Sequence, residues 1–344
     1  MTTMHDVALR AGVSAKTVSR VFNNDPHVSK ATRERVEVAM KELNFIPNML
    51  ARTFREGRAS VVGIAVPDIA DSFFASIIRE VDQIAQTKGY SIVVTSLGDE
   101  PSREQVIVET LLHRQMDGLI IAPISSDQGY LKKWLERVPL VFIDREPQNI
   151  AADLFIEDDE GGAITAVAHL VERGHQAIAF VGDSENVITT RRRLEGYREA
   201  LATAGIPFDD DLLLLVPPEE ASERLGELLR SSKIPSAIFS SNSRTSIEIV
   251  PALQRLKRTN IALVSFGDFP MASSLNPSVT VLDQDPAQLG RAAAVRLFAR
   301  IDSPSKRFKR RTVLGVNLIE RASSTSRVKW HSSTRSDGDA PEVS

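Results

Sequence analysis

The chain has 344 residues, of which 42% are hydrophobic and 25% are charged, a balance typical of a globular protein with two or three domains. It contains no cysteine, which excludes disulfides, thiolate metal ligands and thiol nucleophiles. No segment reaches the apolar length of a membrane helix, and the first residues lack the basic and apolar regions of a secretory signal. We therefore expect a cytoplasmic protein with no membrane partner.

The net charge of −3 is unevenly distributed. Residues 1–60 contain ten Lys or Arg and six Asp or Glu, so this head carries +4 and the remainder −7. A basic head on an acidic body indicates a polyanionic partner for the head alone. Chance clustering is the alternative, since an excess of +4 in sixty residues is modest.

Three short helices are predicted in the head. Gly12 ends the first, because glycine readily adopts a positive φ, and Ser14 is placed to cap the second. A third begins after Ser29, and Pro47 interrupts the chain beyond it. The apolar stripes of these helices are Met4, Val7, Ala8 and Ala11; then Val18, Val21 and Phe22; then Val36, Ala39, Met40 and Leu43.

The second helix carries hydrogen-bond donors opposite its apolar residues. Lys16 and Arg20 can each donate to O6 and N7 of a guanine, whereas short donors suit phosphates, which set register rather than sequence. These short donors are Ser14, Thr17, Ser19 and Asn23. A helix with an apolar rear face and a donor-rich front can occupy a major groove. An ordinary solvated amphipathic helix is the alternative.

From Val61 onward, strands and helices alternate. The predicted strands span residues 61–66, 90–95, 118–122, 140–143, 177–181, 237–240, 262–266 and 279–282. Alternation predicts parallel sheets with helices on both faces, and about 260 residues suffice for more than one sheet. The fold class is therefore α/β: a small all-α helix-turn-helix head and a two-lobed body with parallel sheets around a cleft.

Candidate ligand-binding residues lie where the predicted strands end, because ligands in such folds bind at the carboxyl ends of strands. The rings of Phe73 and Phe74, after the first strand, can stack on another ring or on a sugar face. The other candidates, at strand ends or at the crossing between lobes, are Asp144, Arg145, Phe155, Arg193, Asn242, Asp268 and Gln284. For each residue alone, surface charge or helix capping is an alternative. As a set they favour a binding cleft.

An enzyme is the rival class. The sequence has no Gly-rich dinucleotide loop, no Gly-Lys-Ser/Thr phosphate loop and no His-Glu-x-x-His motif. His169 and His175 are interpreted as structural or solvated side chains, and the acids of Glu157–Glu160 are explained by the N-terminus of a helix. We expect no cofactor and no metal. A secreted sugar-binding protein is a third class, against which the head and the missing signal argue.

The head resembles that of the lactose repressor (LacI/GalR) family of transcription regulators. The matching motifs are Asp6-Val7-Ala8, Ala11-Gly12-Val13-Ser14, Thr17–Asn23, His27-Val28-Ser29, Thr32-Arg33 and Leu43–Asn48. The likeness extends over the chain to about Arg321. It implies that Ala15 and Lys16 hold the two main base-reading positions, that Arg20 reads a guanine, and that His27 contacts DNA.

The resemblance also implies a hinge helix at Asn48–Arg55. Eight residues form barely two turns, too few for a stable helix in water, and in the family two such helices from a dimer pair in the minor groove. Asn48, Ala51 and Phe54 then contact DNA, and Phe54 replaces the usual Leu as the apolar wedge. The alternative is that Phe54 packs on the sensor.

The family's sensor is similar to a periplasmic sugar-binding protein, and its effector contacts map onto Phe73, Phe74, Asp144, Arg193 and Asn242. Where many members have an effector-binding Asp, this chain has glycine, in Gly267-Asp268. We expect that contact to be lost or passed to Asp268. No particular sugar or purine is indicated.

The resemblance implies a transcription regulator, in the simplest case a repressor and not an enzyme. Its expected partners are double-stranded operator DNA, a second copy in a homodimer, and a small-molecule effector that is a sugar or related metabolite. The predicted domains are the helix-turn-helix at 1–46, the hinge helix and linker at 47–59, the sensor at 60–321 and a disordered tail at 322–344. Within the sensor, the N-lobe spans about 60–158 plus 287–318, and the C-lobe about 159–286.

Overall fold

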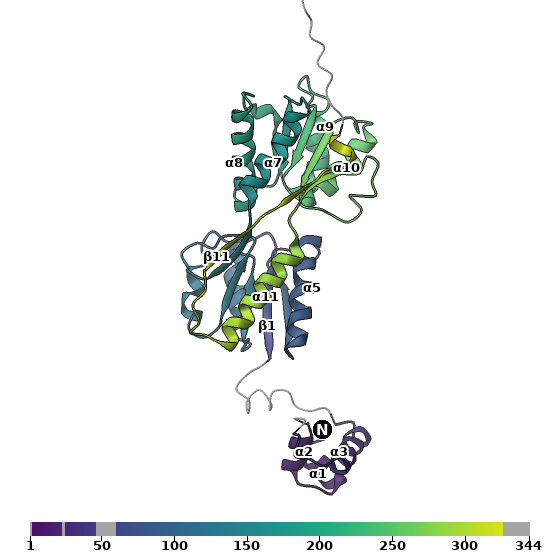
Figure 1. Ribbon diagram of the computed structural model, residues 1–344, viewed down its shortest axis with the longest axis vertical. Coiled ribbons are helices and arrows are strands. Elements are labelled where there is room, and N and C mark those ends of the chain that lie inside the picture. The colour runs from purple at the N-terminus through teal and green to yellow at the C-terminus, as the bar shows by residue number, and fades with distance from the viewer. Residues whose placement is uncertain (1, 23–24, 46–59, 326–344) are drawn as a thin grey trace, which may run out of the picture. The chain divides into compact units, whose positions relative to one another are not determined.

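The computed structural model describes residues 2–22, 25–45 and 60–325 (Figure 1). The chain divides into two compact units, the head Met1–Ala59 and the sensor Ser60–Ser344. The predicted hinge at 47–59, with Asn48, Ala51 and Phe54, lies outside the described residues, as does Asn23.

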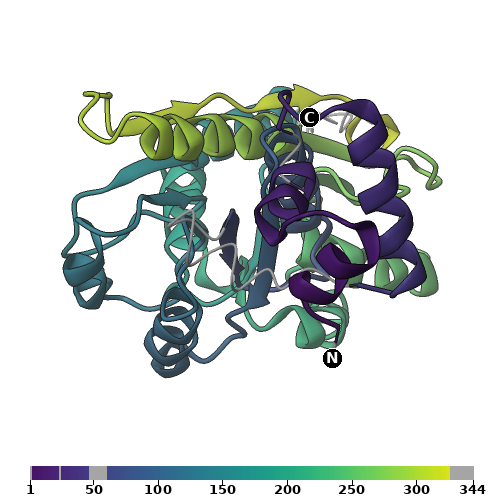
Figure 2. The same ribbon diagram turned by 90° about the horizontal axis from the view of Figure 1, so that it is seen from below.

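Three helices form the described part of the head: α1 (Met4–Ala11), α2 (Ala15–Phe22) and α3 (Lys30–Glu42), drawn in purple in Figure 2. Thr3 and Asp6 form a capping box at the start of α1, and Gly12 ends this helix at a φ of 65°. The apolar stripes meet in one small core of buried residues, Val7, Ala8, Ala11, Val18, Val21, Val36 and Ala39. This packing leaves Ala15, Lys16 and Arg20 of α2 exposed.

The N-lobe of the sensor is a six-stranded, all-parallel sheet in the order β11-β5-β4-β3-β1-β2. Its strands are β1 (Val61–Val66), β2 (Ser91–Ser96), β3 (Gly118–Ile121), β4 (Leu140–Ile143), β5 (Asp153–Glu157) and β11 (Arg311–Leu314). Its helices are α5 (Ser72–Thr87), α6 (Glu104–Leu112) and α11 (Pro286–Asp302), with 3₁₀ turns η1 (Pro101–Arg103) and η2 (Gly129–Trp134). Helices α5 and α11 lie side by side on one face of the sheet (Figure 1), and α6 packs on the other.

The C-lobe sheet has the order β12-β10-β9-β8-β6-β7, with β12 antiparallel to β10 and all other pairs parallel. Its strands are β6 (Ile178–Gly182), β7 (Leu213–Leu215), β8 (Ala237–Ser240), β9 (Ala262–Phe266), β10 (Thr280–Asp283) and β12 (Asn317–Ile319). Its helices are α7 (Asp159–Glu172), α8 (Ile188–Thr203), α9 (Pro218–Leu228) and α10 (Ser243–Arg255), with turns η3 (Asp210–Leu212) and η4 (Ala322–Ser324). The pair α7 and α8 covers one face, and the pair α9 and α10 the other.

The α/β fold class is confirmed. Central strands such as β1, β3 and β4 are continuous apolar runs because both of their faces are buried, as in parallel sheets covered by helices. The described chain passes between the lobes three times, after β5, after β10 and after β11. In Figure 2, α11 (yellow-green) and the yellow strands that follow it run along one flank of the sensor.

The third crossing comes earlier than the sequence predicts. The predicted N-lobe segment 287–318 includes Asn317 and Leu318, but these residues belong to β12 in the C-lobe. Leu318 pairs there with Leu282 of β10. Only Gly315 and Val316 separate β11 from β12, so the chain changes lobe directly after β11.

The predicted start of a disordered tail at residue 322 is wrong. Ala322–Ser324 form η4, in which Ser323 and Ser324 are buried. Ser323 Oγ donates to Leu263 O at 2.6 Å and accepts from Thr280 N at 2.9 Å. Small hydroxyl side chains, read in the sequence as a polar tail, here satisfy buried polar groups of the C-lobe.

Both histidines of the helix α7 region are buried. His169 Nε2 lies 2.7 Å from Ser324 Oγ, and His175 Nδ1 lies 3.1 Å from Ser236 Oγ. Within the described ranges, no group of three or more His, Asp or Glu side chains is arranged to hold a metal ion. Nor does any helix there have the length and apolar character needed to cross a bilayer.

Ending the chain after Arg321 is expected to lower the free energy of unfolding of the sensor by roughly 2 kcal/mol or more, because Thr280 N and His169 lose their buried partners. Urea denaturation measures the effect, with a chain ending after Thr325 as the matched control. Equal stability of the two shortened chains would contradict the role assigned to η4.

Candidate functional site

The N-terminus of α2 is capped as the sequence predicts. Ser14 Oγ accepts from Thr17 N at 3.1 Å, and the hydroxyls of Ser14 and Thr17 lie 2.9 Å apart. Ala15 and Lys16 are exposed, whereas Thr17 and Ser19 are half-buried. The exposed start of α2 therefore presents a methyl group and an ammonium group, with the short hydroxyls engaged in capping.

Arg20 lies one turn beyond Lys16, on the same face of α2. Its side chain is 55% exposed, and its Nε lies 3.5 Å from Asp25 Oδ2. An exposed ion pair of this length is worth at most about 1 kcal/mol, so a base or phosphate can displace Asp25. His27 is exposed in the loop before α3 and donates its backbone N–H to Asp25 Oδ1. Lys16, Arg20 and Ala15 thus form one solvent-facing surface, defined here as the reading face.

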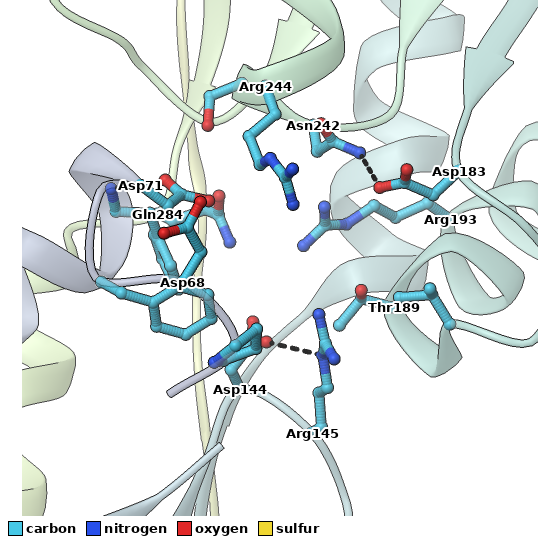
Figure 3. Close-up of a pocket in the computed structure, with 15 residues that line it drawn as sticks. Asp68, Asp71, Asp144, Arg145, Asp183, Thr189, Arg193, Asn242, Arg244 and Gln284 are labelled. Carbon is cyan, nitrogen blue, oxygen red and sulfur yellow. Dashed lines mark hydrogen bonds and ion pairs between the residues drawn. The ribbon is translucent and has the colours of Figure 1, made fainter. Parts of the chain in front are cut away.

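A cleft of about 60 Å³ lies between the two lobes of the sensor, at the carboxyl ends of their strands (Figure 3). It is lined by Pro67, Asp68, Asp71, Phe73, Phe74, Asp144, Arg145, Asp183, Val187, Thr189, Arg193, Asn242, Ser243, Arg244 and Gln284. The predicted residues among them are Phe73, Phe74, Asp144, Arg145, Arg193, Asn242 and Gln284. The parallel topology of both sheets brings these strand-end side chains together.

Two predicted residues do not line this cleft. Phe155 is buried in the N-lobe core, with the guanidinium of Arg296 5.1 Å from its ring centroid. Asp268 accepts hydrogen bonds from Arg321 Nη2 at 2.6 Å and Nη1 at 3.1 Å. Both side chains are held by arginines distant in sequence, which the strand-end pattern does not reveal.

Gln284, whose side chain lies next to Gly267, lines the cleft, whereas Asp268 does not line it. A Cβ on Gly267 would lie 2.8 Å from Gln284 Oε1, and the φ of Gly267 is 89°. Asp268 instead borders a neighbouring cavity of about 270 Å³, which shares Phe73 and Gln284 with the cleft. Of the two outcomes expected at this position, loss of the contact or its transfer to Asp268, the geometry of the cleft favours loss, and a role of Asp268 in effector binding stays a prediction.

Arg193 of α8 is buried, with 4% of its surface exposed, and held from three sides. Its Nε lies 2.7 Å from Asp159 Oδ1, its Nη1 donates to Ser241 O at 2.7 Å, and its guanidinium sits 3.8 Å from the ring centroid of Phe266. These contacts fix the guanidinium before any ligand enters. Arg193 is thus a structural part of the C-lobe as well as a cleft residue.

Two buried carboxyl groups, those of Glu157 and Asp159, lie at the first crossing between the lobes, close to the cleft. Burial raises the pKa of Asp159 to about 6, although the Arg193 charge opposes the shift. Burial and the nearby Asp144 and Asp159 charges raise the pKa of Glu157 well above its ordinary value. Neither carboxyl oxygen of Glu157 has a hydrogen-bond partner in the described chain. Asp158 caps α7, and Asp159 and Glu160 lie in its first turn, as the helix-terminus interpretation predicts; Glu157 precedes the helix and is not explained by it.

Glu157→Gln is expected to stabilise the sensor increasingly as the pH rises. Because the folded-state pKa of Glu157 lies above its ordinary value of 4.5, its favourable contribution is complete below that pH and is lost as the pH rises through the folded pKa. The gap between variant and wild type should grow by up to about 1.4 kcal/mol per pH unit within that window. Urea denaturation between pH 5 and 8 tests this, with exposed Glu160→Gln as control. A gap that is constant with pH would refute it.

Sequence reasoning missed several residues of the cleft, chiefly Asp68, Asp183, Thr189 and Arg244. Asp183 directly follows β6, and Arg244 lies in the first turn of α10 after β8, so the strand-end rule would have found both. Asp183 Oδ2 accepts from Asn242 Nδ2 at 2.9 Å, while Asn242 Oδ1 caps α10 by accepting from Thr245 N at 2.8 Å. The amide of Asn242 is therefore largely engaged within the protein.

Comparisons with known proteins cover both units. Residues 3–48 match the model for bacterial regulatory proteins of the lacI family, and residues 167–324 match that for the periplasmic binding protein-like domain. The ribose operon repressor of Escherichia coli K12 is 30% identical over 331 residues, which cover 94% of this chain and all of that protein. The chain belongs to the lacI family of bacterial regulatory proteins.

Solved structures of the lacI family support the same assignment. The lac repressor dimer bound to operator and the anti-inducer ONPF has a TM-score of 0.82 at 28% identity, covering 95% of this chain and 99% of that one. A family regulator from Enterococcus faecium with bound ribose has a TM-score of 0.70 at 25% identity, covering 78% of this chain and all of that one. The family and the relatives named here are regulators of transcription.

Proposed function

We propose that this lacI-family chain is a sequence-specific DNA-binding transcriptional repressor whose affinity for its operator is controlled by a small carbohydrate. The observation that carries this function is the cleft between the lobes, where Phe73, Asp144 and Arg193 converge, on the same chain as a helix-turn-helix. An aromatic ring, a carboxylate and a guanidinium are the groups that recognise the apolar face and the hydroxyls of a sugar. The cytoplasm is the compartment that this function requires.

The DNA partner is a duplex operator, read by two copies of the chain. We place the helix-turn-helix at residues 1–46, the hinge at 47–59 and the sensor at 60–325, extended to include η4. The lac repressor to which this chain is similar binds its operator as a dimer, and a homodimer presents two reading faces to two half-sites. Lys16 and Arg20 carry the polar base contacts, with phosphate contacts from the short donors around them.

A carbohydrate is supported by the relatives and by the composition of the cleft. The relatives include a ribose operon repressor, a regulator solved with ribose and a regulator solved with cellobiose. In the cleft, the ring of Phe73 lies edge-on to Phe74 with centroids 5.1 Å apart, beside Asp71 and Asp144. A sugar bound there contacts both lobes and so favours one arrangement of the lobes over another, which couples the cleft to the head.

Selection from random duplex DNA with the purified full chain tests the function. The chain should enrich one palindromic site, and a sugar from a panel of pentoses, hexoses and their acids should change the affinity for that site. Coupling of this kind is typically about 1–3 kcal/mol, or roughly 5- to 150-fold. Enrichment of no site, or a selected site whose affinity no carbohydrate changes, would contradict the proposal.

A further inference from the structure

Three guanidinium groups converge on the cleft between the lobes, from Arg145, Arg193 and Arg244 (Figure 3). Arg193 is bonded to Asp159 and Ser241 O, as described above. Arg145 Nε lies 3.3 Å from Asp144 Oδ2, and its Nη1 donates to Pro123 O at 3.3 Å. Arg244 differs from both, because within residues 60–325 it forms neither a hydrogen bond nor an ion pair.

The acidic side chains of the cleft, in contrast, each have a donor inside the protein. Asp68 Oδ1 accepts from Ala70 N at 2.8 Å, and Asp71 Oδ1 accepts from Phe73 N at 2.9 Å. Asp183 accepts from Asn242, and Asp144 is paired with Arg145. Among the charged side chains that line the cleft, Arg244 is therefore the one for which the described chain provides neither a hydrogen bond nor an ion pair.

The surroundings of Arg244 also favour an anion. Arg244 lies in the first turn of the 13-residue helix α10, whose N-terminus carries a partial positive charge. Gly267 of the neighbouring cavity lies close to the start of this helix, since a Cβ on it would lie 3.8 Å from Ser243 N, and it has no side chain that would cover this backbone group. Asp71 and Asp183 interact with the Arg244 charge across the cleft without forming an ion pair with it. A half-buried guanidinium without a partner gains more from an anion than one already paired.

We infer that the effector is an anionic monosaccharide, one whose carboxylate or phosphate group pairs with Arg244 while its hydroxyls bind the Asp144 and Asp71 carboxylates. This inference rests on the proposed carbohydrate-controlled function and deepens it. Arg244 selects between anionic and neutral sugars. The remaining contacts, with the ring of Phe73 and the guanidinium of Arg193, are common to both classes of sugar.

Calorimetric titration of the full chain with matched sugars tests the inference. The series are D-glucose, D-glucuronate and D-glucose 6-phosphate; D-galactose, D-galacturonate and D-galactose 6-phosphate; and D-ribose, D-ribonate and D-ribose 5-phosphate. In at least one series an anionic member should bind about ten-fold tighter than its neutral partner, or more. The acid and phosphate members of each series distinguish the two sources of negative charge.

Variants assign the preference to Arg244. Arg244→Gln should reduce the anionic-to-neutral affinity ratio to near one, and Arg244→Lys should restore part of it because the charge is kept. Arg255→Gln, at the exposed far end of the same helix, is the matched control and should leave the ratio unchanged. Thermal melting of each variant verifies that the sensor is folded.

Three results would overturn the inference. A neutral sugar that binds as tightly as its anionic partners and changes operator affinity leaves the proposed function standing and removes this inference alone. An anionic preference that persists in Arg244→Gln removes the assignment to Arg244. If the chain binds its selected operator but none of the nine sugars, both this inference and the proposal of a carbohydrate effector are contradicted.

Discussion

Arg193→Ala lowers the free energy of unfolding of the sensor by about 3–5 kcal/mol, because it leaves the buried carboxylate of Asp159 without its counter-charge. The loss should be smaller near pH 5 than at pH 7. Burial already raises the pKa of Asp159 to about 6 in the presence of Arg193, so Asp159 takes up a proton below that pH and no longer needs a cation. Urea denaturation at the two pH values measures both effects. Sugar binding should be lost at either pH, since Arg193 lines the cleft.

Two variants separate the ion pair from the rest of the side chain. Arg193→Met combined with Asp159→Asn removes both charges and should recover part of the lost stability without recovering sugar binding. Arg192→Ala, whose partner Glu146 is partly exposed, should cost less than about 1 kcal/mol. If Arg193→Ala were as stable as Arg192→Ala, the buried ion pair would not hold the C-lobe together.

Lys16→Ala combined with Arg20→Ala should weaken operator binding by roughly 2–6 kcal/mol, since each side chain contributes about 1–3 kcal/mol of base discrimination. Both residues lie on the exposed reading face of α2, and the Asp25 pair that Arg20 gives up is weak. Fluorescence anisotropy with operator and random duplexes at one fixed salt concentration measures the loss. Random duplex should lose much less.

The matched control is Lys41→Ala, an exposed lysine near the end of α3 that is not on the reading face. It should weaken operator and random DNA little and by similar factors. Equal losses on operator and random DNA for the double variant would instead identify Lys16 and Arg20 as phosphate contacts.

The strands whose bounds the sequence predicts correctly are short and mostly apolar. Val61–Val66, Leu140–Ile143, Ala237–Ser240 and Ala262–Phe266 have the predicted bounds. Strand β5 was missed, because charged residues flank its short apolar stretch. Asp153 at its start is buried and bound by Arg296 and Arg300, which lie on α11 more than 140 residues away.

The strand-end rule predicted some residues of the candidate site correctly and failed for others. Strand-end position was enough to place Asp144, Arg145, Asn242 and Gln284 in the cleft, because parallel strands bring their carboxyl ends to one edge. It failed for Asp268, whose carboxylate is taken by Arg321. The strand-end rule was also not applied to Arg244, which is important because it has no hydrogen-bond or ion-pair partner among the described residues. The sequence does not reveal this, because the partners of a charged side chain depend on the packing of both lobes.

The sequence by itself determined the alternation of strands and helices, the family and the exposed polar face of α2, because apolar periodicity, helix caps and motif spacing are local properties of the chain. Only the tertiary structure decided which charges neutralise one another. Arg193 forms an ion pair with Asp159, Asp268 with Arg321, and Asp153 with Arg300 of α11, while Arg244 lines the cleft. Each of these pairs joins residues whose separation along the chain carries no information about their distance in the fold. Breaking a buried pair, such as that of Arg193 and Asp159, leaves an uncompensated buried charge.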